Sequence, residues 1–267
     1  MASRAEQKAA ARAAREARLH AATQAQARRM RLIWLGGIVL AVALVVVVIA
    51  VAVGGGSGVP KASSDKATKA AVTSLLRGIP QKANQLGNSS APVTITEYGD
   101  LVCPVCRDFA VGSEQQLINE YVRTGKAKLV YLADETASED ANNGEFVPSQ
   151  VAALAAGVQG KEWNYNMTWY YEQQSELTSY VTTAFIRNIA SQIPGLNMSE
   201  WTTDLQDPNL SGQVTVDLRQ MNSLVQNKTL SENATPTVIF SGPKGTAPAI
   251  QGAAPFSTLK AYFKAVD

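Results

Sequence analysis

Two segments in the middle of the chain alternate apolar and polar side chains in the way that half-buried β-strands do. They are residues 93–98 and 128–133, and an amphipathic stretch over 109–122 that favours a helix lies between them. A strand, a helix and a second strand in this order predict a β-α-β unit. Strand character returns at residues 237–240 and 248–251, before a final predicted helix over 256–265.

A long helical block interrupts this α/β pattern over residues 147–227. Apolar side chains recur there at the three- and four-residue spacing of one helix face, and Pro148 stands at the first helix start. Asn197 followed by Glu200 is typical of a capped helix start. The other helical segments are residues 151–158, 163–171, 181–189 and 214–225. The pattern therefore predicts an α/β fold with an inserted helical domain.

The most apolar segment of the chain runs from Leu32 to Val53 and contains no charged residue. As a helix it would span about 30 Å, the thickness of a bilayer's hydrocarbon core. Arg28 and Arg29 precede it, whereas a glycine-rich stretch follows it, so we expect a cytoplasmic N-terminus. A cleaved signal peptide is the competing interpretation, because Ala50-Val51-Ala52 resembles a cleavage site, but the apolar run is longer than is usual for one.

These patterns divide the chain into four parts. We expect a basic cytoplasmic tail over 1–31, a transmembrane helix over 32–53, a linker over 54–77 that can form a short helix over 70–76, and one folded domain over 78–267. The formal net charge of +2 on 267 residues is the sum of +6 on the tail and −4 on the rest. The tail has no aromatic residues for stacking on bases, so its charge favours a topology signal and not nucleic-acid binding.

Candidate chemistry is confined to very few residues. The chain has 2 cysteines and 1 histidine, and that histidine, His20, lies in the tail. This excludes Ser-His-Asp hydrolysis, Cys-His proteolysis and a histidine-ligated metal from the folded domain. Both cysteines lie in Cys103-Pro104-Val105-Cys106, where the first predicted strand ends and a helix begins.

The position of this tetrapeptide predicts a redox-active pair. Backbone N–H groups at a helix start stabilise a thiolate, so Cys103 is the candidate nucleophile, and Pro104 suits the first helical turn. Cys106, one turn further on, can resolve a mixed disulfide formed by Cys103. A zinc site would need further ligands, and a structural disulfide closing so short a loop would constrain the unfolded chain little. We therefore expect no metal and no cofactor beyond the Cys103-Cys106 disulfide.

Four features together resemble a known family. They are the CPVC motif after a strand, the segment TEYGDLVCPVC, the helical insertion, and Ala234-Thr235-Pro236-Thr237 at the start of a strand. The combination is similar to DsbA-like thiol:disulfide oxidoreductases of the thioredoxin superfamily, in particular the membrane-anchored actinobacterial type. The resemblance covers residues 78–267. It implies a thioredoxin fold with an inserted helical domain, preceded here by one transmembrane helix, and an extracytoplasmic enzyme held in the cell membrane by a single span.

The resemblance also implies roles for residues outside the cysteine motif. It makes Thr235-Pro236 a cis peptide that faces the active site and binds the substrate backbone. It makes Glu97 a buried acid that moves a proton to or from Cys106. Lys128 is a candidate charge partner of Glu97 on the next strand, and Tyr98 and Asp100 are candidates for the rim of the site.

Val105 departs from the family pattern. Members that act as strong oxidants often carry histidine at this third motif position, and valine offers neither a charge nor a hydrogen-bond donor. We therefore expect a less depressed pKa for Cys103 and a less oxidising disulfide.

The partners that the resemblance implies are unfolded or partly folded secreted proteins and a membrane redox protein. The redox partner is a quinone-linked reoxidase if the enzyme oxidises its substrates, and a transmembrane donor of reductant if it reduces or isomerises them. Two other functions stay open at this point. One is a catalytically inactive thioredoxin-fold binding protein or holdase, and the other is a redox sensor with one dedicated partner.

Overall fold

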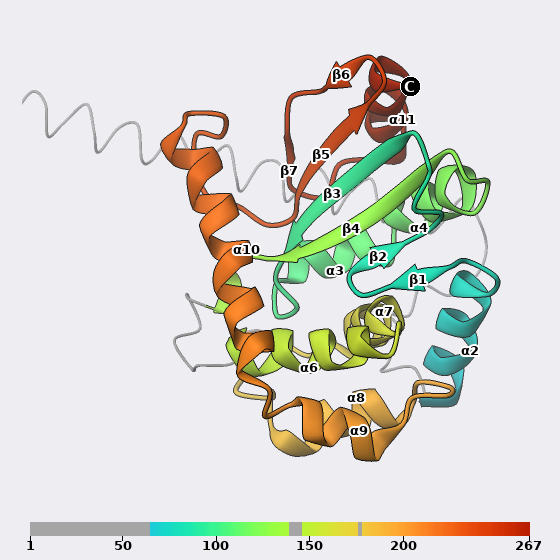
Figure 1. The fold of residues 1–267 in the computed structure, drawn as a ribbon, viewed down its shortest axis with the longest axis vertical. Helices are drawn as coiled ribbons and strands as arrows, with labels where there is room; N and C mark the ends of the chain where they lie inside the picture. Colours follow the sequence, from blue (N-terminus) through green and yellow to red (C-terminus); the bar gives the residue numbers. More distant parts are fainter. Residues whose placement is uncertain (1–64, 139–145, 176–177) are drawn as a thin grey trace, which may run out of the picture. The chain divides into compact units, whose positions relative to one another are not determined.

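The computed structural model describes residues 65–138, 146–175 and 178–267, which form a mixed β-sheet with helices around it (Figure 1). The predicted cytoplasmic tail and the predicted transmembrane helix over 32–53 lie outside these residues. Within the described ranges, no helix combines the length and the apolar character that crossing a bilayer requires.

Three strands form the centre of the sheet. β3 (Val93–Gly99) pairs in parallel with β4 (Ala127–Ala133) and antiparallel with β5 (Thr237–Gly242). The strand order is β1-β2-β4-β3-β5-β6, with β7 also paired to β5. The short strands are β1 (Gln81–Lys82), β2 (Gln85–Leu86), β6 (Gly245–Thr246) and β7 (Ile250–Gln251). The predicted central strands are confirmed, whereas the strand expected over 248–251 is only two residues long.

The two faces of the sheet pack against different helices. Side chains alternate along β3, so Ile95 joins the main core with Phe109, while Tyr98 packs on the other side with Met221. Met221 belongs to α10 (Pro208–Gln226). Residue 97 shares the face of Ile95, which is also the face on which both cysteines are buried.

The segment between β3 and β4 is helical, but it is not one continuous helix. The sequence predicts a helix over 109–122, and the structure begins it earlier and interrupts it at Gly112. The backbone of Gly112 is not helical, and a Cβ there would lie 2.6 Å from the carbonyl oxygen of Asp108. The resulting elements are α3 (Pro104–Ala110), α4 (Ser113–Leu117) and the π-helical turn η1 (Ile118–Val122).

The helical block expected over 147–227 is confirmed. Figure 1 shows its helices gathered at one end of the sheet, with α10 running along the sheet's side. The side chain of Asn197 accepts from the N–H groups of Ser199 and Glu200, at 3.0 and 3.4 Å, and so caps α9 as expected. The remaining helices of the block and the last helix are α6 (Phe146–Val158), α7 (Glu162–Glu172), α8 (Thr183–Ser191), α9 (Met198–Asp204) and α11 (Phe256–Val266).

The folded unit begins earlier than the sequence predicts. Small and polar residues over 54–77 have the composition of a linker, yet residues Asp65–Leu76 form helix α2. Val72, Leu75 and Leu76 lie on one face of α2 and are buried in the main core. The predicted linker is therefore too long at its C-terminal end.

Candidate active site

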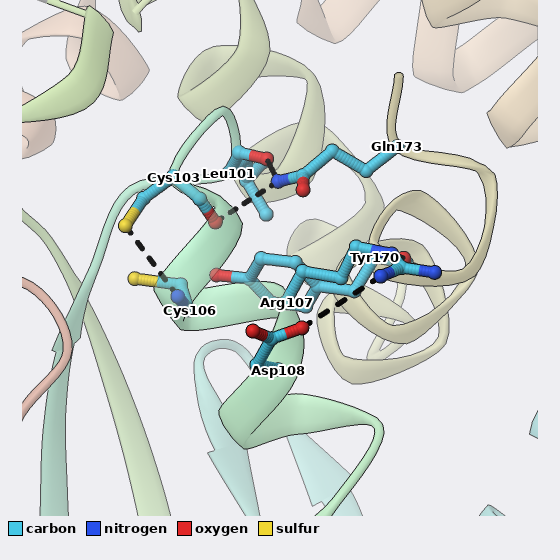
Figure 2. A network of polar contacts seen from close by, with 7 residues as sticks. All are labelled: Leu101, Cys103, Cys106, Arg107, Asp108, Tyr170 and Gln173. Atoms are coloured by element: carbon cyan, nitrogen blue, oxygen red, sulfur yellow. Dashed lines mark hydrogen bonds and ion pairs between the residues drawn. The ribbon is translucent and has the colours of Figure 1, made fainter. Parts of the chain in front are cut away.

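The cysteine motif lies at the start of α3, directly after the turn that follows β3. Cys103 is the N-cap of α3, and its Sγ accepts a hydrogen bond from the backbone N–H of Cys106 at 3.4 Å (Figure 2). Pro104 and Val105 are exposed, whereas only 5% of Cys103 is exposed and Cys106 is completely buried. Both cysteines are free thiols in this structure.

The two thiols have opposite electrostatic environments. Hydrogen bonds, the largest of them from the Cys106 thiol, lower the pKa of Cys103 from 9.0 to about 7, although its partial burial acts in the other direction. Burial raises the pKa of Cys106 well above 9.0, and its interactions with Cys103 add to the effect. Near neutral pH Cys103 can therefore act as a nucleophile, whereas Cys106 holds its proton and needs a base before it can react.

The loop before β5 faces the motif. The peptide bond between Thr235 and Pro236 is cis, as the family resemblance implies. The Cys103 thiol donates to the carbonyl oxygen of Thr235 at a sulfur–oxygen distance of 3.6 Å, and the hydroxyl of Thr235 hydrogen-bonds that of Thr136. Residues 132 positions apart thus meet at the reactive sulfur, while the binding of a substrate backbone here stays a prediction.

Glu97 is buried on β3, as expected, but its neighbour is an acid and not a lysine. Only 1% of Glu97 and 1% of Glu114, on α4, is exposed, and the two carboxyl groups interact. Burial raises the pKa of both, and the charge of Glu97 raises that of Glu114 well above its ordinary value. Two buried carboxyls in contact share a proton, because both cannot ionise together without a counter-charge.

The expected pairing of Lys128 with Glu97 is wrong. In the parallel register of β3 and β4, Lys128 lies beside Thr94, and its Nζ donates to the carbonyl oxygen of Ser89 at 2.9 Å. The residue beside Glu97 is Tyr131, three positions further along β4. An error of one or three positions in register moves a side chain to the other face of the sheet.

Neither of the two residues expected at the rim lies there. Asp100 is completely buried, and its carboxylate accepts from the N–H groups of Val102, Thr136 and Ser138 at 2.9, 3.2 and 2.9 Å. It thereby holds the turn that leads to the cysteine motif against the segment after β4. Tyr98 lies on the face of the sheet that α10 covers, away from the cysteines.

Two residues of α7 and the segment after it contact the motif and were not anticipated. The side-chain amide of Gln173 donates to the carbonyl oxygens of Leu101 and Cys103, at 2.7 and 3.1 Å (Figure 2). Figure 2 also shows the side chain of Tyr170 reaching toward Cys106 with its hydroxyl foremost. The Nε of Arg107 donates to the carbonyl oxygen of Tyr170 at 3.1 Å, which ties α7 to α3.

The sequence holds a signal for only one of the unanticipated residues. Glu114 lies three positions before Leu117, on the apolar face of its helix, so its burial could be predicted from helical spacing. No local pattern indicates Tyr170 or Gln173, because their contacts depend on how the inserted helices pack. Across the described ranges, no group of three or more His, Cys, Asp or Glu side chains is gathered as a metal site would require.

Comparison with known proteins identifies relatives of this chain. Residues 81–253 match a protein-family model described as Thioredoxin. The chain is 26% identical over 133 residues to a probable disulfide bond formation protein D of Bacillus anthracis, and 23% identical over 158 residues to disulfide bond formation protein D of Bacillus subtilis. These alignments cover 49% and 57% of this chain but only 60% and 65% of the relatives, which is less than two thirds of their lengths.

Solved structures show a similar fold. Oxidised BdbD from Bacillus subtilis superposes with a TM-score of 0.55 at 18% identity, over 70% of this chain and 95% of that one. DsbA from Chlamydia trachomatis gives 0.55 at 15% identity, over 68% and 89%. The α-DsbA1 protein of Wolbachia pipientis gives 0.53 at 17% identity, over 71% and 90%. These neighbours support an α/β thioredoxin-like fold with a helical insertion.

Proposed function

Since the chain belongs to the thioredoxin family, we propose that it is a DsbA-like thiol:disulfide oxidoreductase that exchanges disulfides with other proteins through Cys103 and Cys106. The observation that carries the proposal is the contrast between the two thiols. Cys103 stands at a helix start with a pKa of about 7, and Cys106 is buried with a raised pKa. A nucleophile beside a protonated resolving thiol is the arrangement that disulfide exchange requires.

In the oxidising direction, a substrate thiolate attacks Sγ of Cys103 in the enzyme disulfide. The Cys103-Cys106 bond breaks, and Cys106 leaves and takes up a proton. A second substrate thiolate then attacks the substrate sulfur of the mixed disulfide, and Cys103 leaves as a thiolate. The substrate has lost two electrons, the enzyme has gained them, and the same steps in reverse reduce a substrate disulfide.

The substrate side of the proposal concerns extended polypeptide. Val105 is 41% exposed, and Pro104 beside it is exposed as well, so a segment in contact with Cys103 can pass over them. The carbonyl oxygen of Thr235, which precedes Pro236, lies 3.6 Å from the Cys103 sulfur. A substrate segment that lies there must have a backbone that is not hydrogen-bonded within its own protein. This favours unfolded or partly folded secreted proteins as substrates.

The location is part of the proposal and derives from the sequence alone. The apolar segment over 32–53, with its arginines on the N-terminal side, would hold the domain outside the cytoplasmic membrane. A membrane redox protein would then restore the active state of Cys103 and Cys106. The redox state of the cysteine pair in cells distinguishes oxidation of substrates from their reduction or isomerisation. The pair of an oxidase is mostly oxidised in cells, whereas that of a reductase or isomerase is mostly reduced.

Trapping with Cys106→Ala in cells tests the proposal. Without its resolving thiol, the variant should accumulate mixed disulfides between Cys103 and several secreted proteins, which non-reducing electrophoresis and mass spectrometry would detect. Cys103→Ala is the matched control and should form none. A single adduct would favour a dedicated redox sensor, and partners retained after replacement of both cysteines would favour a binding module; either result contradicts the proposal.

A further inference from the structure

We propose that Tyr170 and Tyr131 form a buried proton path between the Cys106 thiol and Glu97, and that Glu114 positions Glu97 as the acceptor at its end. The inference rests on the proposed function, because it concerns the proton that Cys106 loses when it attacks a mixed disulfide and regains when it leaves one. It assigns this transfer to two hydroxyl groups and one further acid.

The path consists of polar groups that are buried close together without hydrogen-bond partners. Tyr131 and Tyr170 are 3% and 1% exposed, and neither hydroxyl oxygen has a hydrogen-bond partner among the described residues. The same holds for both carboxylate oxygens of Glu97 and for one of Glu114. Such groups cost free energy in a core, so a cluster of them beside a reactive thiol requires a reason.

The order of the groups follows from the strand register and the neighbouring helix. Glu97 and Tyr131 are directly adjacent across the parallel pair β3 and β4. The ring of Tyr131 extends over Gly99 toward the motif, so closely that a Cβ on Gly99 would lie 3.0 Å from the tyrosine hydroxyl. The Tyr131 hydroxyl interacts with that of Tyr170, and Tyr170 points from α7 toward Cys106 (Figure 2).

The direction of the contacts suits transfer away from Cys106. Burial raises the pKa of both tyrosines, and their mutual contact raises that of Tyr170 further and lowers that of Tyr131, so the path places Tyr170 as the donor. Burial and the charge of Glu97 raise the pKa of Glu114 well above its ordinary value, so Glu114 keeps its proton beside Glu97. Other titratable and charged groups near this cluster are Cys103 at the start of α3, Asp100 after β3, and Arg107 on α3, whose Nε donates to the carbonyl oxygen of Tyr170.

In the resolving step, Cys106 forms a bond to Sγ of Cys103 and the substrate sulfur leaves as a thiolate. The proton of Cys106 passes to the oxygen of Tyr170, the proton of Tyr170 passes to Tyr131, and that of Tyr131 passes to the Glu97 carboxylate. Each tyrosine ends neutral, as it began. When Cys106 is the leaving group, the same transfers run in reverse and protonate it.

Replacing each tyrosine by phenylalanine tests the path. Reduced protein is mixed with glutathione disulfide, which links one glutathione to Cys103. The rate at which this glutathione is then released measures the attack by Cys106. We expect Tyr170→Phe and Tyr131→Phe to slow this step at pH 7 by about tenfold or more, within the range that positioned proton transfer contributes. The rate in the variants should rise with pH by about tenfold per unit, because hydroxide must then take the proton, whereas the wild-type profile is flatter.

Tyr165→Phe is the matched control. Tyr165 is fully buried on the same helix, but its hydroxyl lies 3.5 Å from the carbonyl oxygen of Ile186, away from the cysteines. This variant should keep the wild-type rate and pH profile, and all three should keep the pH midpoint of Cys103 alkylation, measured with Cys106 replaced by alanine. The path is excluded if Tyr131→Phe and Tyr170→Phe resolve as fast as wild type, or if Tyr165→Phe is slowed equally.

A rescue experiment tests the role of Glu114. Should a tyrosine variant not fold, this experiment still tests the proposal. Glu114→Leu removes the donor to Glu97 and should slow resolution about tenfold at pH 7, whereas Glu114→Gln retains a donor and should keep the rate. Glu162→Leu removes another buried acid, on α7, and should leave the rate unchanged. Equal rates for Leu and Gln at position 114 would refute the role of Glu114. A wild-type protein that fails to exchange would instead refute the proposed function.

Discussion

Single residues at the motif differ in charge state because they differ in burial and in hydrogen-bond donors. Cys103 receives the backbone N–H of Cys106 and is the thiol whose pKa falls to about 7. Cys106 lies three residues further on, on the buried side of the same helical turn, where burial keeps it protonated. Val105 between them is exposed and adds no charge, so substitutions there can change the electrostatics without disturbing the core.

Val105→His should lower the pKa of Cys103 by about one unit, because an imidazolium near the sulfur favours the thiolate. The pH dependence of alkylation by iodoacetamide measures this, with Cys106 replaced by alanine in both proteins. Because the hydrogen bond from the Cys106 thiol is the largest cause of the Cys103 pKa of about 7, the midpoint of the Cys106→Ala reference protein should lie above 7. Val105→Ala is the control and should keep that midpoint; an unchanged midpoint in the histidine variant would show that position 105 does not influence the thiolate.

Asp134 provides a test of stability against pH. It is 1% exposed, its Oδ1 accepts from Nδ2 of Asn233 at 3.3 Å, and its Oδ2 has no partner. Burial raises its pKa from 3.8 to about 7. The folded state therefore binds more protons than the unfolded state between these values, so its contribution to stability is complete below pH 3.8 and is lost as the pH rises to about 7.

Asp134→Asn removes this titration. The free energy of unfolding of the variant relative to wild type should increase from pH 4 to pH 7 and then level off, with a gain of about 1 kcal/mol or more at pH 8. Urea unfolding at pH 4, 6 and 8 measures it. Asp108→Asn, at an exposed position, should show no such trend. A difference that is the same at all three pH values would contradict the assignment to Asp134.

At the scale of elements, the sequence predicts the helices and caps that depend on the local spacing of side chains. The helices of the insertion follow from apolar residues three and four positions apart, and the cap of α9 follows from Asn197. Of helix α2 only the second half, over 70–76, could be predicted, because the small and polar residues before it resemble a linker, and its buried face at Val72 and Leu75 was not recognised as core. The neighbour of Glu97 was missed because register between strands is not a local property.

The inserted helices also restrain the motif, and no local pattern indicates this. Gln173→Ala removes the donor to the carbonyl oxygens of Leu101 and Cys103, so the turn before α3 should open more readily. We expect faster amide hydrogen exchange over residues 101–106, by about tenfold, with the protection of β3 unchanged. Gln174→Ala, at the exposed neighbouring position, is the control. Equal exchange in both variants would show that the amide of Gln173 does not hold the turn.

At the scale of the whole molecule, the fold brings residues that are distant in sequence to one pair of sulfur atoms. Cys103 meets Thr235 from the loop before β5, and Cys106 meets Tyr170 from the insertion. The cysteines could be identified from their spacing and their position at a helix start, and Glu97 and Thr235-Pro236 from the resemblance to a family. The sequence could not identify Glu114, Tyr131 and Tyr170 as a group, because these residues lie on three separate elements, α4, β4 and α7.

The central claim is that Cys103 attacks and Cys106 resolves, and one measurement tests it most directly. A reduced model protein with a single native disulfide is mixed with the oxidised purified domain, quenched with acid and analysed by mass spectrometry. The account predicts rapid formation of the substrate disulfide by the wild type, and none with Cys103→Ala. With Cys106→Ala and an oxidised substrate it predicts one stable adduct through Cys103. Wild-type protein no faster than Cys103→Ala, or an adduct through Cys106 in the Cys103→Ala protein, would contradict it.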